Sequence, residues 1–189
     1  MWINYYLLFI IILIMKIEFN VTIISLIVII IVIYLLTISK FMNRPLWHNP
    51  RRVIDFKLDG KETSQQVMDI YSLSHITHGI IFYFIFKLIK INLTTGFIIS
   101  IILELIWEIF ENTPYIINKY RKNKAYENYK GDSIVNMVGD LFFMILGYYL
   151  SFNSEKYAII YLVVTEICLI PINASFLTLS IGSLMNSYK

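Results

Sequence analysis

The sequence is poor in cysteine and in charged residues. Its single cysteine, Cys168, excludes an internal disulfide and any metal site built from several cysteines. Only 15% of the 189 residues are charged and 58% are hydrophobic, whereas soluble domains have about 25% and about 45–50%. The apolar residues come in blocks, such as the uncharged run 21–39. These features exclude a soluble globular enzyme, a disordered chain and a disulfide scaffold, and they indicate a polytopic membrane protein.

The motifs of several known membrane enzymes are also absent. The sequence has no His-Glu-x-x-His zinc-protease motif and no Gly-x-Ser-x-Gly nucleophile elbow. It lacks the glycine and arginine spacing of CDP-alcohol phosphotransferases and the paired Arg and His motifs of phosphatidate-type phosphatases. An enzyme with this sequence would therefore belong to a less familiar class.

The apolar blocks predict an all-α bundle of about six membrane-spanning helices. One span needs about 20 mostly apolar residues. Six spans would take about 120 residues and leave no room for a separate soluble domain. The first block is short, so five spans with an external N-terminus is the alternative. The expected spans are 2–15, 21–39, 71–91, 97–112, 131–152 and a last one that starts at Tyr157 and passes Pro171.

The chain divides into an N-terminal membrane hairpin (1–39), a polar cytoplasmic or interfacial loop (40–70) and a four-helix membrane core (71–189). Segment 40–70 holds six Lys or Arg residues and segment 115–130 holds five, whereas four lie on the opposite face. Since basic loops stay inside, both segments and both chain termini are predicted to be cytoplasmic.

The expected core helices carry ionisable and amide side chains at helical spacing. At 100° per residue, the three acidic residues of the second core helix fall within about 60° and the three polar residues of the third within about 80°. The two histidines of the first core helix are three residues apart and therefore also share a face. Glu166 lies in the last span. The groups are His75 and His78, then Glu104, Glu108 and Glu111, then Asp132, Asn136 and Asp140.

Each group is expected within roughly 12 Å of the cytoplasmic face, from the rise of 1.5 Å per residue. An ionisable group inside a span costs at least about 2.5–3.5 kcal/mol, so these groups must face each other, a cation or water. Structural alternatives stay open. Glu111 and Asp132 would be capping or solvated surface groups, and Asn136 would form interhelical hydrogen bonds. His75 and His78 would be interfacial histidines that hydrogen-bond a loop, and Glu104, Glu108 and Asp140 would have a purely structural role.

Imidazoles together with carboxylates form a ligand set that suits zinc, manganese or iron. The predicted roles overlap, because one carboxylate can ligate a metal or transfer a proton. The expected metal ligands are His75, His78, Glu108 and Asp140. The expected catalytic groups are Glu104, Glu108, Asp140 and Glu111. The expected substrate-binding groups are Arg121, Asp132, Asn136 and Glu166.

Three motifs lie in order within residues 64–150. They are His75-Ile76-Thr77-His78-Gly79, Trp107-Glu108-Ile109-Phe110-Glu111-Asn112 and Gly131-Asp132-Ser133-Ile134-Val135-Asn136. With these motifs the chain resembles an uncharacterised family of small, alphaproteobacterial-type multi-pass membrane proteins. The last motif is also distantly similar to teicoplanin-resistance VanZ-like proteins. The family resemblance implies a multi-pass protein of the bacterial inner membrane and implies no reaction.

The leading hypothesis is a metal-dependent hydrolase or transferase that acts on a lipid-linked or small anionic substrate at the cytoplasmic face. A small ion- or proton-coupled transporter is the alternative, and a non-catalytic membrane assembly factor is a third reading. The expected partners are membrane lipid and a lipid-linked or small anionic substrate. A homo-oligomer is possible, and in a transporter it would compensate for the small size of the chain. No nucleic-acid partner is expected.

Overall fold

The computed structural model describes residues 21–47, 52–57, 62–122 and 127–172, and the first predicted span, 2–15, lies outside them. Beyond the helices, the described residues form one isolated β-bridge, between Ile54 and Met68. The described chain is therefore mostly helical, as predicted. Its helical elements are α2 (Val21–Thr37), the π-helical η1 (Ile38–Met42), α3 (Ser72–Leu88), α4 (Leu93–Glu111), α5 (Pro114–Tyr120), α6 (Ile134–Asn153), α7 (Glu155–Leu169) and the 3-10 turn η3 (Ile170–Ile172).

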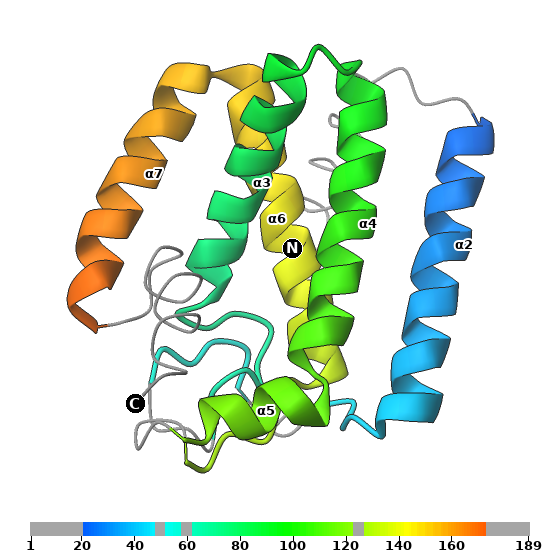
Figure 1. The fold of residues 1–189 in the computed structure, drawn as a ribbon, viewed down its shortest axis with the longest axis vertical. Helices are drawn as coiled ribbons and strands as arrows, with labels where there is room; N and C mark the ends of the chain where they lie inside the picture. The colour runs from blue at the N-terminus through cyan, green and yellow to red at the C-terminus, as the bar shows by residue number, and fades with distance from the viewer. Residues whose placement is uncertain (1–20, 48–51, 58–61, 123–126, 173–189) are drawn as a thin grey trace.

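The long helices stand side by side, and the short α5 lies across one end of them (Figure 1). We call this end, where α3 and α6 begin and where α2, α4 and α7 finish, the α5 end. Helix α3 packs against α4, α6 and α7, and α2 contacts α4. The described parts of both basic segments lie at the α5 end (Figure 1), so the basic residues that the structure describes in them lie on one side of the bundle.

The backbones of α3 and α6 touch at two glycines. A Cβ added at Gly79 would lie 1.9 Å from the carbonyl oxygen of Met144, and one added at Gly147 would lie 1.9 Å from that of Ile76. Only glycine fits at such distances. Small residues at helix contacts are typical of membrane bundles, where close packing takes the place of the hydrophobic effect.

Capping residues set the helix boundaries and explain two departures from the predicted spans. The Ser133 side chain accepts from the Asn136 N–H and caps α6, so this helix begins at Ile134 and not near Gly131. The predicted basic loop contains α5, because Thr113 caps it and Pro114 occupies its first turn, where proline loses no hydrogen bond.

The segment 62–69 packs into the α5 end. Gln65 and Gln66 are buried, and the Ser64 carbonyl accepts from the Ser133 N–H at 2.9 Å. The Gln65 side chain donates to the Gly131 carbonyl at 2.7 Å. This polar segment therefore fixes the start of α6.

Among the described helices, α4 and α6, with 19 and 20 residues, are long and apolar enough to cross a membrane. Helices α2 and α3 have 17 residues each and α7 has 15, below the usual length of about 20. The surface of the bundle is apolar, with Ile106 57% and Ile167 65% exposed, whereas Glu104 and Glu108 are buried. This supports a membrane location, and the count of six spans stays a prediction.

Candidate metal centre

Three helices bring the predicted ligands to one place. His75 and His78 lie in the first two turns of α3, Glu104 and Glu108 in the second half of α4, and Asp140 in the second turn of α6. Because α3 and α6 start at the α5 end and α4 finishes there, these positions share one level of the bundle (Figure 1). Because the two ligands on α3 are three residues apart and the two on α4 are four apart, each pair lies on one face of its helix. These faces point toward each other.

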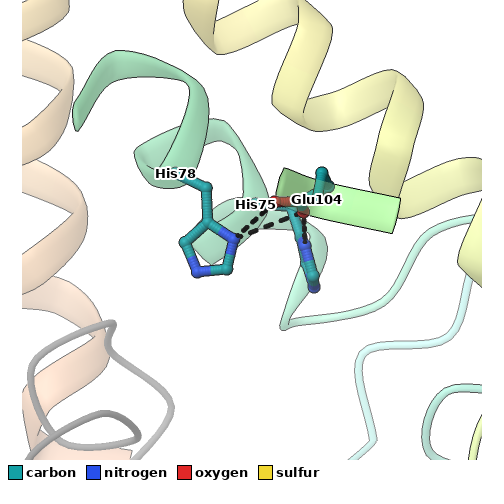
Figure 2. A group of neighbouring side chains, drawn as sticks. All are labelled: His75, His78 and Glu104. Atoms are coloured by element: carbon teal, nitrogen blue, oxygen red, sulfur yellow. Dashed lines mark hydrogen bonds and ion pairs between the residues drawn. The ribbon is translucent and has the colours of Figure 1, made fainter. Parts of the chain in front are cut away.

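The first group is His75, His78 and Glu104 (Figure 2). The Nδ1 atom of His75 lies 2.5 Å from Oε1 of Glu104, and Nδ1 of His78 lies 3.1 Å from Oε2 of the same carboxylate. The two rings stand edge to face with centroids 4.9 Å apart. One fully buried carboxylate thus faces two imidazoles.

The second group is His75, Glu108 and Asp140. His75 Nδ1 lies 3.6 Å from Glu108 Oε1, and His75 Nε2 lies 3.7 Å from Asp140 Oδ2. All three residues are buried. The other Glu108 oxygen, Oε2, is buried and has no hydrogen-bond partner among the described residues. Both ring nitrogens of His75 therefore face carboxylates.

Both groups have the spacing of metal ligands. In each group the three possible ligand atoms lie within 4.8 Å of one another. Zinc bonds of about 2.0–2.2 Å place tetrahedral ligand atoms roughly 3–3.6 Å apart, close to the 3.1 Å between His78 and Glu104. Glu108 and Asp140 face different nitrogens of His75, and one metal can bind only one of these nitrogens. The contact between His75 and Glu104 is shorter and has the length of a hydrogen bond. Since His75 belongs to both groups, we treat the five side chains as one centre.

Two residues that were not predicted as part of the site, Ser72 and Asp69, hold Asp140 in place. The Ser72 hydroxyl donates to Asp140 Oδ1 at 3.0 Å and accepts from the Asp69 N–H at 3.1 Å. The Asp69 carboxylate accepts from the N–H groups of Tyr71 and Ser72 at 2.8 and 3.1 Å. Asp69 three residues ahead of Ser72 at a helix start is a capping pattern that the sequence displays.

Burial raises the pKa of Asp69, and the charge of Asp132 raises it further, against the hydrogen bonds from Tyr71 and Ser72. A negative charge at this position is therefore disfavoured.

Asp132 lies outside the two ligand groups found among the described residues. Its carboxylate accepts from the Asn112 amide at 2.5 Å and from the Tyr129 hydroxyl at 2.6 Å. Its N–H donates to Asn112 Oδ1 at 2.7 Å. Burial, and then the charge of Asp132, raise the pKa of Tyr129, so the phenol keeps its proton. Asp132 is thus buried and fully engaged, neither a solvated residue nor the N-cap of α6.

The other predicted residues surround the centre. The Asn136 amide donates to the Gln66 carbonyl at 2.9 Å, and Glu111 accepts from the Tyr120 hydroxyl at 3.0 Å. Arg121 donates to the Tyr129 carbonyl at 2.6 Å, and Glu166 is buried on α7. Arg44, which was not predicted, donates to the Asp132 and Lys130 carbonyls at 2.8 and 2.6 Å. These contacts connect the loops of the α5 end; the substrate-binding roles stay predictions.

Comparison with known proteins gives relatives without an assigned activity. Residues 40–187 match a family described as "Protein of unknown function (DUF2585)". A "UPF0314 protein" of Sphingopyxis alaskensis is 38% identical over 129 residues, which cover 62% of this chain and 65% of the relative. A "UPF0314 protein" of Brucella anthropi is 33% identical over 131 residues, which cover 68% of this chain and 67% of the relative.

A "UPF0314 protein" of Paracoccus denitrificans is 34% identical over 121 residues, 63% of this chain and 59% of the relative. The chain thus spans between 59% and 67% of the length of these curated relatives. No solved structure matches. The predicted resemblance to an uncharacterised bacterial family is confirmed, and the VanZ-like resemblance stays a prediction.

Proposed function

Because the chain belongs to the family of proteins of unknown function DUF2585, which brings no activity with it, we propose its function from the site alone. The protein is a membrane-embedded, metal-dependent hydrolase or transferase of the bacterial inner membrane. Its ligands come from His75, His78, Glu104, Glu108 and Asp140. Its substrate is anionic or lipid-linked and is reached from the cytoplasmic face, where the basic loops lie.

The observation that carries the proposal is the burial of three carboxylates around two imidazoles. Glu104, Glu108 and Asp140 are 0%, 1% and 3% exposed. Imidazoles that bind a metal are neutral, so each of these carboxylates that stays ionised needs a cation as its partner. Buried ions are stable only when they are paired or bind a metal. A divalent cation supplies the missing charge, and Glu108 Oε2, without a hydrogen-bond partner among the described residues, is a free ligand atom.

A divalent metal at this position would polarise a carbonyl or phosphoryl oxygen and lower the pKa of a bound water. The carboxylates supply the remaining chemistry. Five side chains exceed the three protein ligands of a typical catalytic zinc by two, so a carboxylate that does not bind the metal can transfer a proton. Ser72 holds Asp140 through its hydroxyl. Ligand and proton-transfer roles can therefore be divided within the cluster.

The basic residues of the α5 end indicate that the substrate is negatively charged. Arg121 and Lys122, at the end of α5, and Lys130 are exposed. They lie at the end of the bundle that carries the centre (Figure 1). Guanidinium and ammonium groups at a membrane surface bind phosphate and anionic headgroups. We therefore propose a phosphate- or carboxylate-bearing substrate.

Metal analysis of the purified protein tests the proposal. The full chain is exposed to Zn²⁺, Mn²⁺ and Fe²⁺ separately, and bound metal is measured with His75→Ala/His78→Ala alongside. The matched control is Glu155→Gln, which removes a carboxylate that pairs with Lys87 and Tyr83 at the opposite end. We expect stoichiometric metal in the wild type and the control and a loss in the double variant. Absence of all three metals from folded wild-type protein overturns the proposal.

A proton- or ion-coupled transporter is the second candidate, and one observation favours it. Ionisable and hydroxyl groups follow one another from His78 through Glu104, His75, Asp140 and Ser72 to Asp69. The step from His75 to Asp140, at 3.7 Å, is longer than a hydrogen bond. Such chains transfer protons in transporters. Proteoliposome flux that requires Glu104 and Asp140 supports this candidate, whereas substrate turnover in detergent micelles supports the enzyme.

A further inference from the structure

The five proposed ligands are not equally buried. The side chains of His75, Glu104, Glu108 and Asp140 are between 0% and 7% exposed, whereas that of His78 is 13% exposed. His78 lies beside the Glu104 carboxylate (Figure 2). It is therefore the ligand through which the centre comes nearest to the surface of the bundle.

Apolar side chains of α3 and α4, two helices that pack against each other, lie around His78. The centroid of its ring is 6.2 Å from that of Phe82 and 6.1 Å from that of Trp107. Residues four and seven positions apart share one face of a helix, and on this basis we define the α3–α4 seam. It consists of His78, Phe82 and Ile85 on α3 and of Leu103, Trp107 and Phe110 on α4. Ile85 and the three residues of α4 are exposed.

The neighbouring helices cover other faces of α3 and α4. Ala158 of α7 packs with Ile76 and Ile80, and Ile80 points about 160° away from His78 around the helix axis. Helix α6 meets α3 at Gly79, and α2 contacts α4 on the side away from α3 (Figure 1). The seam therefore faces outward, on a helix, α4, that is long and apolar enough to cross a membrane.

Polar segments close the α5 end over the centre. Segment 62–69 crosses α6 next to Asp140, since a Cβ added at Gly139 would lie 2.1 Å from the Val67 carbonyl oxygen. The buried Ser133 hydroxyl donates to the Gln65 carbonyl at 3.1 Å. Within the described residues, these contacts leave no direct way from the cytoplasmic side to Asp140.

Apolar side chains close the centre toward the opposite end of the bundle. Ile101 lies three residues before Glu104 on α4, and Met144 lies four residues after Asp140 on α6. Both belong to the buried core together with Tyr148. Of the sides of the centre that the described residues form, the α3–α4 seam is thus the one at which a ligand is partly exposed.

We propose that the substrate enters laterally through the α3–α4 seam, which makes it a membrane lipid with an anionic headgroup and not a soluble anion. The inference rests on the proposed function and names its substrate class. The hydrocarbon part lies along Phe82, Ile85 and Leu103, and the headgroup reaches His78. Trp107 lies in the last turns of α4, at the depth where tryptophan is enriched in membrane proteins. A free anion would have to lose its hydration to pass the same apolar seam.

Binding to the cobalt-loaded protein tests the route of entry. The full chain is placed in phosphatidylcholine nanodiscs, which leave both membrane faces open to water, and is loaded with Co²⁺, whose visible absorption changes with its ligands. Phosphatidic acid in the bilayer is compared with glycerol 3-phosphate, the same headgroup without acyl chains, in solution. We expect phosphatidic acid to change the spectrum and millimolar glycerol 3-phosphate to leave it unchanged. A response to glycerol 3-phosphate that equals or exceeds the response to the lipid overturns the proposal.

Two neighbouring residues of α4 provide a matched pair of variants. Leu103→Trp fills the seam, whereas Ile102→Trp, at a similarly exposed position (36% against 39%), lies on the side that faces α2. We expect Leu103→Trp to weaken the response to phosphatidic acid about tenfold, or about 1.4 kcal/mol of binding, and Ile102→Trp to leave it unchanged. Equal losses overturn the proposal. If Leu103→Trp does not fold, the comparison of the two phosphates in the wild type decides.

Bound cobalt, measured on the same samples, separates this inference from the proposed function. Cobalt without a response to phosphatidic acid means that something else covers the seam, such as a second copy of the chain. That result removes lateral entry and leaves the metal centre. Absence of bound metal overturns the proposed function, and the lipid substrate with it.

Discussion

Replacing Ser72 with alanine removes one hydroxyl that connects the metal centre to the start of α3. Ser72 is fully buried. Its hydroxyl donates to Asp140 Oδ1 at 3.0 Å and accepts from the Asp69 N–H at 3.1 Å. The substitution leaves all five proposed ligands in place but removes the group that orients one of them.

Two magnitudes follow from these contacts. Removing a residue that orients a metal ligand costs typically 10–100-fold in metal affinity. The Asp69 N–H also loses its acceptor, which costs about 1–3 kcal/mol of folding free energy. Ser72→Ala should therefore weaken both metal binding and stability.

The assay is a metal titration against a chelator of known affinity, with thermal unfolding measured on the same preparation. Ser151→Ala is the matched control, because Ser151 is equally buried and its hydroxyl donates to the Gly147 carbonyl at 3.0 Å, in the last turn of α6. Both variants are expected to lose stability, but only Ser72→Ala is expected to lose metal affinity. Equal metal affinities for both variants and the wild type would refute the reasoning.

Three further changes test other parts of the structure. Gly79→Ala forces a methyl group against the Met144 carbonyl and should lower the free energy of unfolding, measured with denaturant, by about 3 kcal/mol or more. The control Gly96→Ala meets side-chain atoms only and should cost less. Equal losses would contradict the close contact of α3 and α6. Asp69→Asn tests pH dependence. Because the folded-state pKa of Asp69 is raised, the contribution of Asp69 to stability is fully present below its unfolded pKa of about 3.9 and is lost as pH rises through the folded pKa. The variant should show a smaller fall in Tm from pH 4 upward, and an unchanged fall would contradict the raised pKa. Asp132→Asn should cost about 1–3 kcal/mol with metal content unchanged, and a parallel loss of metal would place Asp132 in the centre.

The convergence of the five side chains could be predicted because it follows from helix periodicity. Residues three or four apart on one helix share a face. The short turn from α3 to α4 and the longer segment 112–133 from α4 to α6 determine which helix ends meet. His75 and His78, Glu104 and Glu108, and Asp140 needed no further information. Their distances to one another had to come from the structure, since periodicity gives only directions.

The surroundings of Asp132 could not be predicted by the same reasoning. The arc from Asp132 to Asp140 assumed that α6 begins before Asp132, whereas Ser133 caps the helix one residue later. The partners of Asp132 lie on segments joined by tertiary contacts, Asn112 after α4 and Tyr129 after α5. Loop contacts of this kind have no periodic signal in the sequence.

The close contacts of Gly79 with Met144 and of Gly147 with Ile76 also bear on how the proposed centre would open. Because the backbones of α3 and α6 approach closely at both glycines, we expect the two helices to move together and to carry His75, His78 and Asp140 with them. Glu104 and Glu108 belong to α4, outside this pair. If the protein is the proposed enzyme, we therefore expect substrate entry to displace α4 against the other two helices, so that Glu104 and Glu108 are the proposed ligands that move.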